Sequence, residues 1–110
     1  MALVVDASGT QAAVISTEHI LRTTTTSGTF VLVVNTTAMA NGDVTELRLY
    51  TKPLSGSTSV VAYVAIYSNV QASVVKYSVP VPCNNECKVT LKQTAGTGRS
   101  YEWALLQIDG

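Results

Sequence analysis

An all-β fold, a two-sheet antiparallel sandwich of about eight short strands, is predicted by three features of this 110-residue sequence. First, 16 Val, 4 Ile and 15 Thr make up 35 of the 110 residues, and β-branched side chains suit a pleated sheet better than a helix. Second, turn-forming residues divide the sequence into short apolar runs at intervals of roughly ten residues. Third, no segment keeps a sustained helical spacing. We expect a jelly-roll-like arrangement, with an immunoglobulin-like one as the alternative.

The predicted strands follow one another between these turns. They cover residues 2–6, 11–17, 29–35, 44–51, 58–68, 73–81, 86–92 and 100–108. Gly and Asn mark turns such as 8–9 and 41–43, because hairpin turns place residues at positive φ. Pro80 and Pro82 each remove a backbone donor, so we expect the segment that they end to lie at a sheet edge or to leave the sheet.

The chain is expected to form one domain, residues 1–110, whose first ten residues can form an extended N-terminal arm. Its N-terminus has no basic residue, and the apolar run after Met1 ends at Asp6. A signal peptide needs a basic start, and a membrane span needs about twenty apolar residues. We therefore expect neither a secretion signal nor an interaction with membranes.

The charge of the chain also restricts its partners. Seven Lys and Arg balance seven Asp and Glu, and charged residues make up only 13% of the sequence. A nucleic-acid binder needs a basic surface that displaces counterions from phosphates, so no nucleic-acid partner is expected. The hydrophobic content of 46% is enough to fill a core, which argues against disorder.

Few residues could support catalysis or metal binding. His19 is the only histidine, and the sequence contains no G-x-S-x-G nucleophile motif. Together with Cys83 and Cys87 it gives three soft ligands, whereas a structural zinc site uses four. We therefore predict no catalytic residues, no metal, no cofactor and no enzyme. The two cysteines bracket a short turn and can form a disulfide that would stiffen this turn; a reduced pair is the alternative.

The strand predicted within 58–68 is apolar on both faces. Under strict alternation, Val60 and Ile66 belong to one face and Val61 and Tyr67 to the other. A sandwich of this size covers only the inner face of each sheet, so the other face meets a loop or another molecule. The segment 100–108 has the same character. The candidate protein interface therefore comprises Val61, Tyr63, Ala65, Tyr67, Tyr101 and Trp103.

Several blocks resemble a known class of proteins. These blocks are residues 40–52, 54–58, 60–63 and 91–100 together with Trp103. Over residues 28–108 the chain resembles small β-rich structural proteins of tailed bacteriophages, some of which are capsid cement or decoration proteins. The resemblance implies a virion structural protein on the capsid exterior, made in the host bacterial cytoplasm. Its implied partners are the major capsid protein of the same phage and the chain itself, as a dimer or trimer.

A second interpretation is a tail or fibre module that contacts host glycans. Aromatic side chains can stack on sugars, although an aromatic residue on a strand more often packs against its cross-strand neighbour. This interpretation predicts that Tyr50, Tyr67 and Trp103 line one exposed groove.

Overall fold

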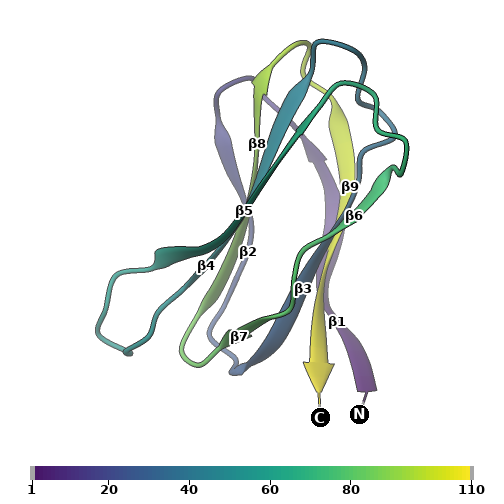
Figure 1. Ribbon diagram of the computed structural model, residues 1–110. Helices are drawn as coiled ribbons and strands as arrows, with labels where there is room; N and C mark the ends of the chain where they lie inside the picture. Colours follow the sequence, from purple (N-terminus) through teal and green to yellow (C-terminus); the bar gives the residue numbers. More distant parts are fainter. Residues whose placement is uncertain (1, 110) are drawn as a thin grey trace.

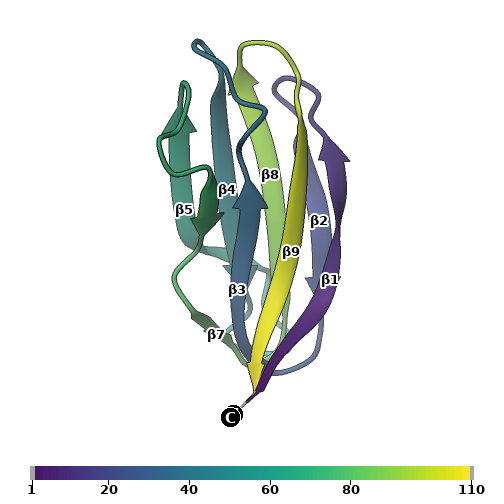
Figure 2. The same ribbon diagram turned by 90° about the vertical axis from the view of Figure 1, so that its right-hand side faces the viewer.

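Nine strands form two antiparallel sheets that pack face to face in the computed structural model, which describes residues 2–109 (Figure 1). The predicted β-sandwich is therefore confirmed. Figure 1 shows the two layers side by side, and the view turned by 90° shows the order of the strands within them (Figure 2). No helix among the described residues is long and apolar enough to cross a membrane.

The five-stranded sheet has the order β1-β9-β3-β6, and β7 also pairs with β3. Its strands are β1 (Ala2–Ala12), β9 (Ser100–Asp109), β3 (Gly28–Asn35), β6 (Val75–Tyr77) and β7 (Val81–Cys83). The four-stranded sheet has the order β2-β8-β4-β5. Its strands are β2 (Glu18–Thr24), β8 (Cys87–Ala95), β4 (Val44–Thr51) and β5 (Val60–Ser68).

This strand order is that of a jelly roll. The chain pairs with itself as one long antiparallel ribbon: β1 with β9, β2 with β8, β3 with β6 and β7, and β4 with β5. Rolling the ribbon places alternate pairs in opposite sheets, which is the double-sheet arrangement of this fold.

The core lies between the two sheets and follows the period of two that a strand imposes. Along β4, Leu47 and Leu49 are buried, whereas Glu46 and Arg48 point outward, as the sequence predicts for this strand. The largest fully buried hydrophobic side chains come from both sheets: Phe30, Leu32, Leu47, Leu49, Leu91, Tyr101 and Leu105.

The first two predicted strands differ from the structure. Residues 2–12 form one continuous strand, β1, hydrogen-bonded to β9 along its length. The expected turn at 8–9 is absent because Gly9 lies flat in the strand opposite Trp103, with room for the indole ring beside it. The described part of the expected N-terminal arm is thus a sheet strand, and Met1 lies outside the described residues.

The predicted strand 73–81 is divided into β6 and β7. Between them, the backbone N–H of Ser78 donates to the Leu32 carbonyl at 2.8 Å, and the Leu32 N–H donates to the Ser78 hydroxyl at 2.9 Å. The Ser78 side chain therefore replaces a backbone partner in the ladder. Both short strands lie at the edge of the five-stranded sheet, as the two prolines predict.

Candidate interaction surface

The outer face of the five-stranded sheet is apolar over four neighbouring strands. Its residues alternate with buried ones such as Leu32 and Leu105 and therefore point away from the core. The strand register aligns them in three successive rows that contain only two polar positions, Ser8 and Thr29. We call this surface the apolar face; it comprises Leu3, Val5, Val31, Val33, Tyr77, Ala104, Leu106 and Ile108.

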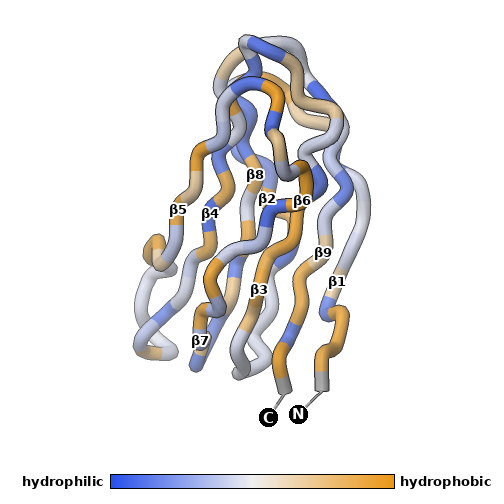
Figure 3. The backbone as a smooth tube through the Cα atoms, turned by 45° about the vertical axis from the view of Figure 1, so that its right-hand side comes forward, coloured by the Kyte–Doolittle hydropathy of each residue, from blue (hydrophilic) through white to orange (hydrophobic). Residues whose placement is uncertain are grey.

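Figure 3 shows hydrophobic segments lying side by side on β1, β9 and β3, to which both the outward residues and the core residues of these strands contribute. With strands about 4.8 Å apart and a rise of about 3.4 Å per residue, three rows on four strands cover roughly 400 Å² when flat. Leu3, Val5 and Tyr77 are each more than half exposed, whereas Val31 is only 9% exposed and the other members are partly buried. Contiguous apolar patches of several hundred Å² mark interaction sites on many soluble proteins.

A polar row borders the apolar face at one end. Thr10, Glu102 and Asn35 lie side by side there, and the Asn35 amide donates to the Glu102 carboxylate at 3.1 Å. Within the described part of this sheet, Glu102 is the only charged side chain at the outward register positions. A shallow hollow of about 250 Å³ lies where this row meets the apolar face, lined by Val33, Asn35, Val75, Glu102, Trp103 and Ala104.

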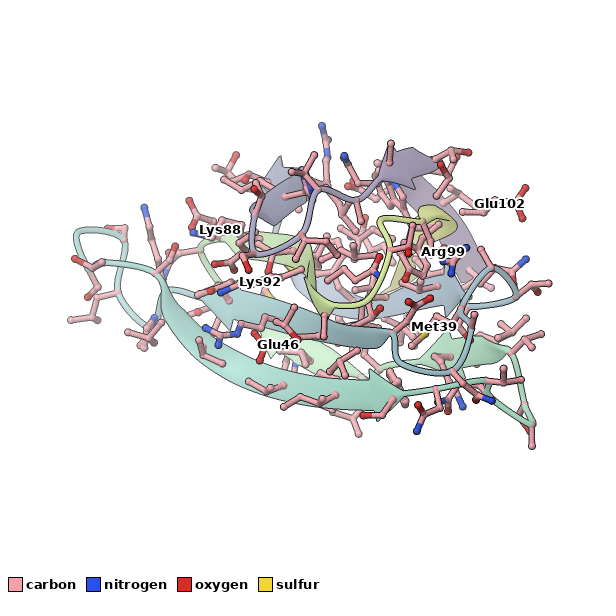
Figure 4. All side chains as sticks on the ribbon, turned by 90° about the horizontal axis from the view of Figure 1, so that it is seen from above. Met39, Glu46, Lys88, Lys92, Arg99 and Glu102 are labelled. Carbon is pink, nitrogen blue, oxygen red and sulfur yellow. The ribbon has the colours of Figure 1, made fainter. Side chains whose placement is uncertain are left out.

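The outer face of the four-stranded sheet carries charged side chains at its centre. Glu46, Lys88 and Lys92 project from β4 and β8 on this side (Figure 4). The register places Lys92 between Glu46 and Glu18, so charges of opposite sign alternate across the sheet. Arg48 donates to Glu46 at 2.6 Å. Toward the two edges of this face, Ile20 on β2 and Val61, Val64 and Ile66 on β5 are exposed apolar residues.

Hydrogen bonds draw Glu18 into this polar surface. Tyr50 and Thr90 each donate a hydroxyl proton to its carboxylate at 2.6 Å, and the Lys88 ammonium lies 4.3 Å from the centre of the Tyr50 ring. Partial burial raises the pKa of Glu18. The two hydrogen bonds and the nearby Arg48 and Lys88 charges together lower it by more, so the pKa of Glu18 lies below its usual value.

Most of the predicted interface residues lie on the inner faces of the two sheets, toward the core, and not on the outer faces. Leu49 pairs with Tyr63 and Tyr50 with Val61, so Ala62 is an extra residue that forms a β-bulge. The bulge reverses the alternation, and Val61 shares the outer face with Val64 and Ile66. Three of the predicted residues instead pack toward the core or line the inner face: Tyr63, Ala65 and Tyr67.

The two predicted interface residues on β9 also point inward. Tyr101 is fully buried, and Trp103 is half-buried against the core, so this part of the prediction is wrong for Tyr101. The face that β9 turns outward is the opposite one, Ala104, Leu106 and Ile108. The sequence indicates that β9 is apolar on both faces, but the predicted interface falls on the buried one.

The three aromatic residues of the glycan interpretation are not brought together. Tyr50 lies on the outer face of the four-stranded sheet. Tyr67 points inward beneath the Lys76 ammonium, which is 4.9 Å from its ring centre. Trp103 belongs to the other sheet. These rings therefore do not form a common groove.

The residues considered for catalysis and metal binding are also dispersed. His19 accepts a hydrogen bond at Nε2 from the Val14 backbone N–H at 3.0 Å, which fastens the turn between β1 and β2. In the part of the chain that the structure describes, no three His, Cys, Asp or Glu side chains are grouped so that they could hold a metal ion.

Cys83 and Cys87 are buried free thiols. Cys83 ends β7 in one sheet and Cys87 begins β8 in the other, so the pair connects the two layers. The Cys83 Sγ donates to the Val81 carbonyl at 3.7 Å. The neighbouring thiol lowers the pKa of Cys83 and raises that of Cys87, because the two groups titrate as a pair. A disulfide between them stays a prediction.

Asp43 forms a buried polar cluster that the sequence did not reveal. It is 1% exposed, and its carboxylate accepts hydrogen bonds from the Ala40 and Thr97 backbone N–H groups and from Arg99 Nε, at 2.9, 3.1 and 2.9 Å. These contacts join the β3–β4 loop to the β8–β9 loop. The two sequence blocks around residues 40–52 and 91–100 therefore meet here, and their role at this point is structural.

The Asp43 cluster makes stability dependent on pH. The Ala40 backbone hydrogen bond lowers the pKa of Asp43, burial opposes this, and the Arg99 and Thr97 contacts lower it further. Because the folded pKa lies below the unfolded value of about 3.9, the stabilisation is fully present above that pH and is lost as the pH falls through the folded pKa. We expect the melting temperature of the protein to fall below about pH 4.

Thermal unfolding followed by circular dichroism from pH 2 to 7 measures this effect. Asp43→Asn should flatten the profile below about pH 4, and Glu102→Gln, which removes an exposed carboxylate, serves as the control. An Asp43→Asn profile that runs parallel to that of the unmodified protein would contradict the assignment.

Comparison with protein-family models, with curated proteins and with solved structures finds no significant match to this chain.

Proposed function

We propose that this chain is a non-enzymatic structural protein of a tailed-phage virion that binds the outer capsid surface as a stabilising cement. The single observation that carries the proposal is the apolar face, which extends over four strands of a molecule with no net charge. The resemblance of residues 28–108 to small phage structural proteins supplies the partner class, the major capsid protein.

Such a protein acts by mass action. A molecule that binds the assembled shell and not its dissociated subunits stabilises the assembly. Even if the whole footprint of roughly 400 Å², which includes Ser8 and Thr29, counted as buried apolar surface, about 25 cal/mol per Å² would yield at most about 10 kcal/mol, whereas association costs roughly 4–15 kcal/mol. One copy of the face therefore binds weakly, and self-association, which adds further faces, would strengthen the attachment.

The two outer faces suit different surroundings. Removing the apolar face from water costs little desolvation free energy, because Glu102 at its border is the only charged side chain at the outward positions of the described part of this sheet. The charged centre of the outer face of the four-stranded sheet, with the ion pair between Arg48 and Glu46, would lose more solvation on burial, although Ile20, Val64 and Ile66 are exposed toward its edges. This difference favours an orientation with the five-stranded sheet toward the shell.

The jelly-roll order by itself does not decide between the two interpretations. The fold occurs both in viral capsid proteins and in lectins, and a fold does not imply a function. The glycan interpretation expects Tyr50, Tyr67 and Trp103 in one groove, and they lie on separate faces. The geometry therefore favours the capsid interpretation.

Co-sedimentation with expanded, genome-free shells of the phage proposed to encode the chain tests this function. The unmodified protein should saturate the shells. Val5→Glu and Leu106→Glu, both on the apolar face, should weaken binding at least about 100-fold because a charge would be buried without a partner.

Ile20→Glu is the matched control. Ile20 is about as exposed as Val5 but lies on the outer face of the other sheet, so this variant should bind within about twofold of the unmodified protein. Failure of the unmodified protein to bind, or equal binding by the Val5→Glu variant, would refute the proposal.

A further inference from the structure

The four edges of the two sheets are not equally protected against pairing with another chain. An open edge presents unpaired backbone N–H and C=O groups, and charges, prolines and bulges normally discourage such pairing. On β1, the bulged Asp6 is tied to Arg22 of β2 at 2.9 Å. The edge strand β2 carries Glu18 and Arg22. The β6–β7 edge carries Lys76 and is interrupted by Pro80.

The edge strand β5 lacks these charges and prolines. Its nine residues, Val60–Ser68, contain no charged residue and no proline. Within the described residues it pairs only with β4. Its bulge lies at Ala62, so six residues, 63–68, keep a regular register with β4. Val64 and Ile66 are exposed on its outer side.

We propose that β5 pairs antiparallel with β5 of a second copy, joining two four-stranded sheets into one sheet of eight strands about a two-fold axis. This inference rests on the proposal that the chain is a self-associating virion protein, and it identifies the contact. An isologous contact of this kind needs a self-complementary strand, and main-chain hydrogen bonds between edge strands supply the affinity.

The flanking charges give a small preference for one register. Arg48 pairs with Val64 and Glu46 with Ile66 within one copy. With the axis at Ala65, Val64 faces Ile66 of the second copy, so each outward row has an Arg48 at one end and a Glu46 at the other. Registers centred on Val64 or Ile66 would instead align two Arg48 or two Glu46 side chains. The charges are three strand spacings apart, about 14 Å, which is farther than the Debye length at physiological salt, so screening keeps their contribution small.

The inner side of the strand fits the same register. Tyr63 faces Tyr67 of the second copy on either side of the axis, and the two small Ala65 side chains meet at the centre. Cross-strand aromatic pairs stabilise antiparallel sheets. Directly opposed residues share one face in an antiparallel pair, so the two-fold axis runs perpendicular to the sheet.

That axis has a consequence for binding. A two-fold axis perpendicular to the four-stranded sheet leaves both five-stranded sheets on the same side of the dimer. Both apolar faces then point in one direction, where a single shell surface could engage them together. Two linked contacts bind more tightly than one through effective concentration, which suits a cement whose single face binds weakly.

Size-exclusion chromatography with multi-angle light scattering, at about 1 to 100 µM protein, tests the pairing. The unmodified chain should be a dimer at the upper concentrations. Val64→Glu and Ile66→Lys should each make it monomeric, with dissociation constants raised at least about 100-fold by a charge set against an apolar neighbour. Ile20→Lys, on the opposite edge of the same sheet, should leave the dimer intact.

A double variant tests the register. Val64→Glu combined with Ile66→Lys places opposite charges face to face across the axis at Ala65, and it also places each new charge beside its complement on β4. This variant should recover the dimer. In a register that sets residue 64 opposite residue 64 of the second copy, two Glu side chains would face each other, and the dimer would not be recovered. Circular dichroism confirms that each single variant is folded.

Three results would overturn the inference: a monomer at the highest concentration, a dimer that survives Val64→Glu, or a double variant that stays monomeric. The readout is separate from shell binding. Val5→Glu should weaken shell binding and leave the dimer intact. An unmodified chain that is monomeric but still binds shells refutes the pairing alone. A stable dimer that ignores shells refutes the proposed function alone.

Discussion

Gly96→Ala is expected to destabilise the protein by about 3–5 kcal/mol, enough to unfold many domains of this size. Gly96 has a φ of +89°, a backbone conformation that costs an L-residue about 1–2 kcal/mol. A Cβ there would also overlap the Asp43 carboxylate oxygen and come within 2.8 Å of the Asp43 Cα. The larger part of the loss comes from displacing Asp43 from its hydrogen bonds.

Gly42→Ala separates the two contributions. Gly42 has a similar φ of +99°, but a Cβ at this position would meet no other atom within 4 Å. This variant should therefore lose only the backbone cost, about 1–2 kcal/mol. Urea unfolding gives both free energies. Equal losses in the two variants would show that Asp43 does not hold these loops together.

Gln93→Leu is expected to cost about 3–4 kcal/mol. The Gln93 side chain is fully buried, and its Nε2 donates to the carbonyls of Ala95 and Thr97 at 3.0 and 2.6 Å. Its Oε1 accepts from the Arg99 N–H and the Tyr101 hydroxyl, both at 3.1 Å. Leucine has a similar volume but leaves these groups without a partner, and each unsatisfied buried group costs about 1–3 kcal/mol.

Gln107→Leu is the control for this substitution. Gln107 is only half-buried and makes one long hydrogen bond, 3.4 Å, to the Ser27 carbonyl, so the loss should stay below about 1 kcal/mol. Chemical denaturation of both variants measures the difference. A Gln93→Leu variant as stable as Gln107→Leu would mean that water replaces the lost partners.

The fold class follows from the sequence because it depends on local properties. The abundance of Val, Ile and Thr, the turn spacing and the clean alternation along β4 each act over a few residues. The two strands expected before residue 18 differ from the structure for a tertiary reason. Gly9 is typical of a turn when the sequence is considered alone, but in the structure it pairs with Trp103 of a distant strand, whose indole ring lies beside it.

The interaction surface could be predicted only in part. The sequence shows that segments such as 100–108 are apolar on both faces, yet it does not show which face turns outward. Ala62 illustrates why: this one bulged residue places Val61 on the outer face and Tyr63 on the inner face, although strict alternation would put both on one face, and bulges depend on the partner strand. The apolar face also needs the register of β1, β9 and β3, which no single segment contains.

The Asp43 cluster could not be predicted from the sequence for a similar reason. Asp43 follows a turn signal, where single charges are normally solvated, and its partners Thr97 and Arg99 are more than fifty residues away. Only the jelly-roll strand order brings these loops together. The same holds for Gln93 and Tyr101, because the hydrogen bond between Tyr101 and Thr45, at 2.9 Å, crosses between the sheets.

Electron cryomicroscopy of shells saturated with the protein tests the central proposal most directly, because it reveals which sheet faces the capsid. We predict that β1, β9 and β3 lie against the shell with Val5 and Leu106 in contact, while Glu46 and Lys88 face solvent. Density that places the charged face of the four-stranded sheet on the capsid, or that leaves the apolar face in water, would contradict the account.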